Sequence, residues 1–121
     1  MSIAFVQAIQ NSYSSASLVQ KTFATTTNGA GNMLVVVLFW DDTTTATPTL
    51  SDTATPPNTY HQIGSTFRAS GFGGSACIFA AYNIAAAAIN TNTVSATFGS
   101  AVSFPVIYIG EYSGVALSSA A

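Results

Sequence analysis

The feature that most constrains this chain is an unbroken apolar run, MLVVVLFW at residues 33–40, which is followed at once by Asp41 and Asp42. The run is far shorter than the ~20 residues that a membrane-spanning helix requires. It is rich in valine and phenylalanine and has no helix-capping signal, a composition typical of strands. Because its apolar residues do not alternate with polar ones, the run predicts a strand that is covered on both faces.

Further strand signals follow one another roughly every ten to fifteen residues, separated by segments rich in Gly, Pro, Thr and Asn. Asn28-Gly29 is a strong turn dipeptide, and RASGFGG at residues 68–74 predicts a glycine-rich hairpin connection. Pro105 has no backbone N–H to donate, so the strand that it precedes is expected to begin there or to lie at a sheet edge. The expected strands are residues 3–9, 17–23, 33–40, 49–50, 59–67, 75–84, 93–99 and 103–115.

About eight short strands and no convincing helix predict an all-β fold. We expect an antiparallel two-sheet β-sandwich, of immunoglobulin-like or jelly-roll type, as a single domain over residues 1–121. AAAAINTN at residues 85–92 could form one helical turn, but it is shorter than the ~12 residues that an independent helix needs. The predicted core consists of residues 33–38 with Ile78, Phe79, Phe98, Ile107 and Ile109.

Charged residues are scarce: Asp, Glu, Lys and Arg make up 5% of the chain, against ~25% in ordinary proteins. Nucleic-acid binding is disfavoured, because neutralising phosphates takes clustered Lys and Arg. Membrane insertion is also disfavoured, since neither a basic amphipathic stretch nor a long apolar one is present. Weak self-repulsion and few charges to protect strand edges favour self-association. The charged residues are Lys21, Arg68, Asp41, Asp42, Asp52 and Glu111, with His61 as the one histidine.

Cys77 is the one cysteine, so an intrachain disulfide is impossible, and its apolar neighbours predict a small buried side chain. MSIAFVQAIQNS, at the start of the sequence, lacks the basic region and the long apolar region of a signal peptide. These features leave open a cytosolic protein, a virion component or a mature piece of a larger secreted protein.

Trp40, Asp41 and Asp42 form the first candidate site, either a sugar-stacking platform or part of a Ca²⁺ site. Calcium takes six to eight oxygen ligands, which Asp52 and Glu111 could help to supply. The acids do not follow a D-x-D-x-D pattern. We therefore favour the interpretation that Trp40 ends a core strand and the acids keep a loop in water, with no cofactor and with Ca²⁺ as the alternative.

Catalytic chemistry has little support in the sequence. His61 lacks the further His or Cys partners of a metal site, apart from Cys77. Glu111 precedes a serine, but the G-x-S-x-G nucleophile motif is absent. Within an apolar strand, Glu111 is more typical of a loop anchor that accepts backbone hydrogen bonds. The sequence thus predicts a protein that is not an enzyme.

Five segments occur in a characteristic order: FVQ, AGNMLVVVLFWDD, LSDTATPPNTY, IFAAYNIAAAAINTNTVSATF and IGEYSGV. Together they resemble a β-sandwich domain of bacterial, notably acidobacterial, secreted and cell-surface proteins, whose segments read AGNLLVV with a tryptophan, SVTDSAGNTY, YYAKNI, NTVTVTF and EYSG. The resemblance covers residues 5–115 and implies a non-catalytic module, found in repeat arrays or beside carbohydrate-binding and adhesive domains. The family domain continues past EYSG, so the chain looks C-terminally short beside it.

The sequence and this resemblance together predict a structural or adhesive module of an extracellular, cell-surface or filamentous assembly, as part of a larger secreted protein. We expect a homo-oligomer or filament joined through strand edges, with residues 2–10 as the segment best suited to exchange. The alternative is a carbohydrate-binding module that contacts glycans; an enzyme is a distant third. The glycan-binding aromatics would be Trp40, Tyr60, Phe72, Tyr82 and Tyr112.

Overall fold

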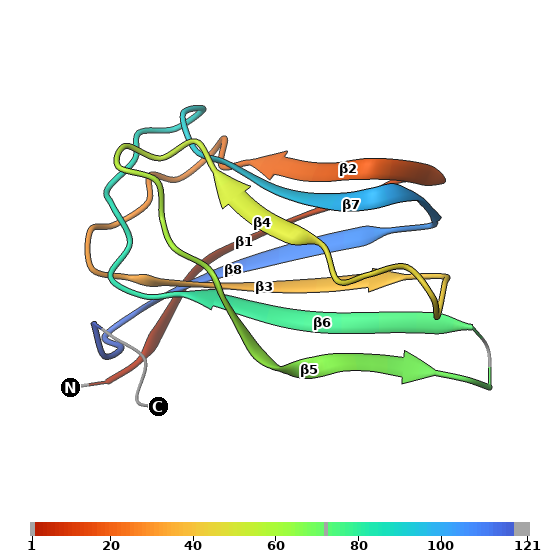
Figure 1. The fold of residues 1–121 in the computed structure, drawn as a ribbon. Coiled ribbons are helices and arrows are strands. Elements are labelled where there is room, and N and C mark those ends of the chain that lie inside the picture. The colour runs from red at the N-terminus through yellow and green to blue at the C-terminus, as the bar shows by residue number, and fades with distance from the viewer. Residues whose placement is uncertain (1, 72, 118–121) are drawn as a thin grey trace.

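The computed structural model describes residues 2–71 and 73–117, and within these residues it contains eight strands and no helix (Figure 1). The alternation of side chains along each segment and the Gly, Pro and Asn turns between them produce this all-β chain. The strands are β1 (Ala4–Ser12), β2 (Ser15–Thr22), β3 (Met33–Trp40), β4 (Thr49–Asp52), β5 (His61–Ala69), β6 (Gly74–Ala81), β7 (Thr93–Ser103) and β8 (Val106–Ser113).

The strands form two antiparallel sheets that face each other (Figure 1). The larger sheet has five strands in the order β1-β8-β3-β6-β5, and the smaller has three in the order β2-β7-β4. The predicted two-sheet antiparallel sandwich is therefore confirmed. The apolar run becomes β3, the central strand of the larger sheet. The alanine-rich segment forms no helix; Ala87 instead makes an isolated bridge with Asn28.

The core fills the space between the sheets and is closed at one end by Trp40, which packs edge-on against Phe98 with 5.0 Å between ring centroids. Apolar side chains of β2, β3, β6, β7 and β8 point into this space, and Ile9 of β1 and Leu50 of β4 pack against them. Seven predicted core residues are buried and so are confirmed: Leu34, Val36, Leu38, Phe79, Phe98, Ile107 and Ile109.

The prediction that β3 is covered on both faces is wrong. Val37 and Ile78, two predicted core residues, are 36% and 41% exposed. They are cross-strand partners on the outer side of the larger sheet, where none of the described strands packs. Met33 and Val35 point the same way and are half-buried. The apolar run therefore has one covered face and one open face.

Three of the four edge strands contain a register shift, and the fourth is very short. The shifts lie between Phe5 and Gln7 in β1, between Ala16 and Leu18 in β2, and across residues 63–67 in β5. β4 has four residues. Bulges and short edges both limit pairing with a further strand.

Charged residues also protect three of these edges from pairing. This is contrary to the expectation that the chain has too few charges to do so. Lys21 on β2 and Asp52 on β4 both lie opposite Val94, on the core-facing side of the smaller sheet. Arg68 on β5 lies opposite the buried Ser75. Core-facing charges on edge strands discourage pairing. β1, by contrast, has no charged residue along its length.

Candidate functional site

Glu111 is fully buried on β8, and its carboxylate accepts four hydrogen bonds from neutral donors. Oε2 accepts from Gln7 Nε2 at 2.7 Å and from Asn28 Nδ2 at 2.9 Å. Oε1 accepts from the Gly29 amide at 2.9 Å and from Asn32 Nδ2 at 2.8 Å. The prediction that Glu111 anchors a loop through a backbone hydrogen bond is confirmed, since Gly29 belongs to the β2–β3 loop.

This network joins segments that are distant in sequence. Gln7 comes from β1, and the asparagines and Gly29 come from the β2–β3 loop. Asn92, fully buried just before β7, extends the network by donating to Asn28 Oδ1 at 3.0 Å. A carboxylate offers about four acceptor sites, so the four bonds leave Glu111 none for calcium or for proton transfer. Its role here is to hold the loop.

Asp52 has an equivalent role at the end of β4. Its Oδ1 accepts from the Ala54 and Asn58 amides, and its Oδ2 accepts from Asn58 Nδ2 and the Tyr60 hydroxyl, both at 2.7 Å. Burial of the Tyr60 hydroxyl, and secondarily the charge of Asp52, raises the pKa of Tyr60 far above its usual range. Tyr60 thus turns its polar end toward Asp52 and stabilises the β4–β5 loop.

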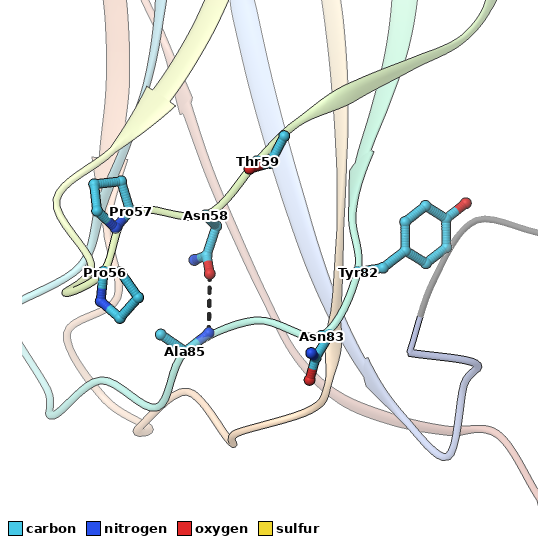
Figure 2. A pocket seen from close by; sticks show the side chains of 7 residues that line it. All are labelled: Pro56, Pro57, Asn58, Thr59, Tyr82, Asn83 and Ala85. Carbon is cyan, nitrogen blue, oxygen red and sulfur yellow. Dashed lines mark hydrogen bonds between the residues drawn. The ribbon is translucent and has the colours of Figure 1, made fainter.

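A shallow hollow of about 270 Å³ lies between the β4–β5 and β6–β7 loops (Figure 2). Asn58 crosses it, because its Oδ1 accepts from the Ala85 amide at 2.9 Å. The Tyr82 ring points away from Pro56 and Pro57 (Figure 2), so the hollow does not present a stacking platform. Its volume is also just below the ~300–1,000 Å³ of typical ligand pockets.

Asp42 forms a turn directly after β3. Its Oδ1 accepts from the Thr45 amide at 2.8 Å and also from the Thr44 amide and hydroxyl. The backbone bonds from Thr45 and Thr44 lower the pKa of Asp42 to about 2. Asp41 beside it is exposed. These positions agree with the interpretation that the two acids shape a solvated loop.

Trp40 is fully buried, with the Arg68 guanidinium 5.7 Å from its ring centroid. A buried ring cannot stack on a sugar, so the structure removes Trp40 from the candidate binding aromatics and confirms that it ends a core strand. Cys77, predicted to be a small buried residue, is 3% exposed. Burial raises the pKa of its thiol to about 11, against a smaller opposing effect of Arg68.

The structure does not gather the remaining candidate residues into one site. Tyr60 bonds to Asp52 and Tyr82 borders the hollow, whereas Tyr112 packs edge-on against Phe5 on the outer side of the larger sheet, 5.9 Å between centroids. Phe72 lies outside the described residues. Within residues 2–71 and 73–117, Asp41, Asp42, Asp52 and Glu111 do not form a metal-binding group, and neither does any other set of three or more His, Cys, Asp or Glu residues.

The outer side of the larger sheet is the feature that sequence reasoning missed, and we call it the apolar face. Cross-strand partners form continuous rows across it, as in Tyr108–Val37–Ile78–Ile63. Seven large apolar side chains there each expose between 36% and 66% of their surface. The apolar face consists of Phe5, Ala8, Gln10, Ser12, Met33, Val35, Val37, Phe39, His61, Ile63, Phe67, Ala76, Ile78, Ala80, Val106, Tyr108, Gly110 and Tyr112.

A sequence signal for this face existed in the strands themselves. β3 and β6 have apolar or small residues at odd and even positions alike, and so does β8 apart from Glu111. A half-covered sheet in water normally alternates apolar with polar residues. Both faces of these strands are therefore apolar.

Comparison of the chain with protein-family models, curated proteins and solved structures gave no match. In the part of the chain that the structure describes, no helix has the length and apolar character to cross a bilayer.

Proposed function

We propose that this chain is a non-catalytic structural module of an extracellular or cell-surface assembly and that it associates with other copies through the edge of β1. The observation that carries the proposal is the neutral edge of β1, beside three edges that each have a charged residue. The resemblance to bacterial cell-surface β-sandwich domains supports the same role.

The β1 edge beyond its bulge, residues 8–12, has the properties of a strand acceptor. In the described sheet, β1 pairs with β8 on one side, so the other side offers free backbone N–H and C=O groups. A strand added there gains main-chain hydrogen bonds. Two β1 edges that meet antiparallel about a two-fold axis form a closed dimer. Exchange of residues 2–10 between copies would keep β8 as the partner of the exchanged strand.

The commitment of the carboxylates to structural bonds supports the non-catalytic part of the proposal. Glu111 and Asp52 each accept four hydrogen bonds within the chain. A general acid or base needs a free position at which to exchange a proton with a substrate. Neither group has one in this fold.

Amide hydrogen exchange at two protein concentrations tests the association. At about 500 μM, residues 4–12 should exchange more slowly than at about 5 μM, because a neighbouring strand covers the free amides of β1. The β4 edge, Thr49–Asp52, serves as the internal control and should not change. Equal exchange of β1 at both concentrations would refute the proposal.

A carbohydrate-binding module is the second candidate, and the exposed aromatics of the apolar face favour it. Phe5, Phe39 and Phe67 are exposed on a sheet surface that also carries Tyr108 and Tyr112. Aromatic rings on an open surface provide apolar area for stacking. A glycan array probed with the wild type and with Tyr108→Ala tests it: binding that the substitution removes supports this role, and a silent array excludes it.

A further inference from the structure

We propose that the apolar face binds a second copy of this chain, sheet against sheet, about a two-fold axis. This contact uses the outer surface of the larger sheet and not the β1 edge. It therefore goes beyond the edge pairing proposed above, and either contact can fail without the other.

The exposed apolar area is close to what a stable dimer needs. Seven large side chains of this face each expose 36% to 66% of their surface. At ~200 Å² for a complete large side chain, they expose roughly 600 Å². A typical monomer has a largest apolar patch of ~300–600 Å², and a standard interface buries ~800 Å² on each partner. Half-buried neighbours such as Val35, Val106 and Tyr112 would supply the remaining area.

The patch is continuous across the sheet. The row Tyr108–Val37–Ile78–Ile63 has an apolar residue on each of four adjacent strands, and Val106–Phe39–Ala76–Phe67 follows beside it. Beyond them lies a row of smaller residues, Gly110, Val35 and Ala80, which ends at His61 on β5; the Tyr112 ring lies against Gly110. The exposed large side chains of the first two rows would interdigitate with those of the second copy, as side chains on the inner faces of sandwiches do.

The distribution of charge favours a second copy as the partner. Among the described residues, the apolar face has no Asp, Glu, Lys or Arg. A charged face meeting its own copy would place like charges together, whereas this neutral face meets itself without repulsion. The six charged residues of the chain lie elsewhere: on the smaller sheet (Lys21, Asp52), in the interior (Glu111), in the loop after β3 (Asp41, Asp42) and on the core-facing side of β5 (Arg68).

The strand order identifies the centre of the contact. β3 has two strands on either side of it in the order β1-β8-β3-β6-β5. A two-fold axis between two such sheets, parallel or perpendicular to the strands, brings β3 over β3 of the second copy. The outward positions on this strand are Met33, Val35, Val37 and Phe39, and Val37 is the more exposed of the two inner ones. In the dimer it therefore lies next to Val37 of the second copy.

Val37→Lys tests this arrangement, because it places two ammonium groups at the axis, where each loses water and meets a like charge. Leu18→Lys is the matched control: Leu18 is 45% exposed on β2 of the smaller sheet, away from the apolar face. Mass is measured by light scattering at about 100 μM. We expect the wild type and Leu18→Lys to show at least twice the 12.4 kDa chain mass and Val37→Lys to show a mass well below that of both.

Far-UV circular dichroism verifies that each variant keeps its β-sheet spectrum. If Val37→Lys fails to fold, Ile78→Lys on the adjacent strand replaces it, with the same expected loss of mass. A monomeric wild type overturns the proposal. If that monomer sediments with phosphatidylcholine vesicles, we would infer that the apolar face binds a lipid surface instead. A folded Val37→Lys variant of wild-type mass also overturns it, and protection of the β1 amides in that variant would assign the association to the edge.

Discussion

Glu111→Gln should destabilise the fold strongly, although it changes one atom. Each carboxylate oxygen accepts two hydrogen bonds, so the new NH₂ group must face two donors. We expect it to face Gln7 and Asn28, because Gln7 Nε2 also donates to the Thr26 carbonyl at 3.1 Å and so keeps a partner. Asn28 Nδ2 then loses its acceptor, while the bonds from Gly29 and Asn32 lose their charge assistance.

The magnitude follows from these losses. One orphaned buried donor costs ~1–3 kcal/mol, and replacing two charge-assisted bonds by neutral ones costs ~1 kcal/mol each. The easier burial of a neutral amide offsets part of this cost. We therefore expect unfolding free energy to fall by about 3 kcal/mol, and Tm by ~12 °C, at ~4 °C per kcal/mol for a chain of this size.

Urea unfolding followed by Trp40 fluorescence, with calorimetry for Tm, measures the change in stability. Asp42→Asn is the control, since the Asp42 carboxylate also accepts backbone bonds but lies at the surface, where water replaces them. Its Tm should change far less than that of Glu111→Gln. A loss below ~1 kcal/mol in Glu111→Gln would refute the reasoning, because it would mean that Asn28 does not lose a needed acceptor.

Three further outcomes follow from the buried and capped groups. Asp42 should remain ionised down to about pH 2 in a carbon-13 NMR titration. Because folding lowers its pKa from 3.8, the stability that its ionised form contributes is complete above pH 3.8 and is lost as pH falls through about 2. A titration midpoint near 4 would contradict the turn geometry. Cys77 should resist iodoacetamide at pH 8 in the native protein and react after unfolding, because burial raises its pKa to about 11; rapid native labelling would contradict its burial. Iodide should fail to quench Trp40 fluorescence in the folded chain, since the ring is fully buried, and quenching equal to that of the unfolded chain would be inconsistent with this position.

The strands could be predicted from sequence because each depends on a local pattern. The strand expected at 75–84 is β6, Gly74–Ala81, although alternation along it puts Ile78 on the outer face and Phe79 in the core, where the sequence had placed both. Pro105 lies directly before β8, as its missing amide predicts. These predictions depend only on residues that are close in sequence, so they do not require knowledge of the sheet topology.

The sequence could not predict which faces of the strands are covered or which residues donate hydrogen bonds to Glu111, since both depend on contacts between distant segments. The run at 33–40 indicated two water-avoiding faces, and the described strands cover one of them. The position of Glu111 indicated a buried anchor, but its donors come from β1 and from the β2–β3 loop. An acid within an apolar strand implies that donors exist without saying which residues supply them.

The position of β8 between β1 and β3 imposes an order on folding. β5 and β6 form a hairpin across a short turn, whereas Gln7 and Glu111, which face each other in the β1–β8 pair, are 104 residues apart. Closing so long a loop costs ~4 kcal/mol of chain entropy by (3/2)RT ln n. β1 also has no place in the sheet until β8 has joined β3. β1 is therefore the last strand of the larger sheet to join. Until it joins, β8 can pair with the β1 segment of its own chain or with that of a second copy.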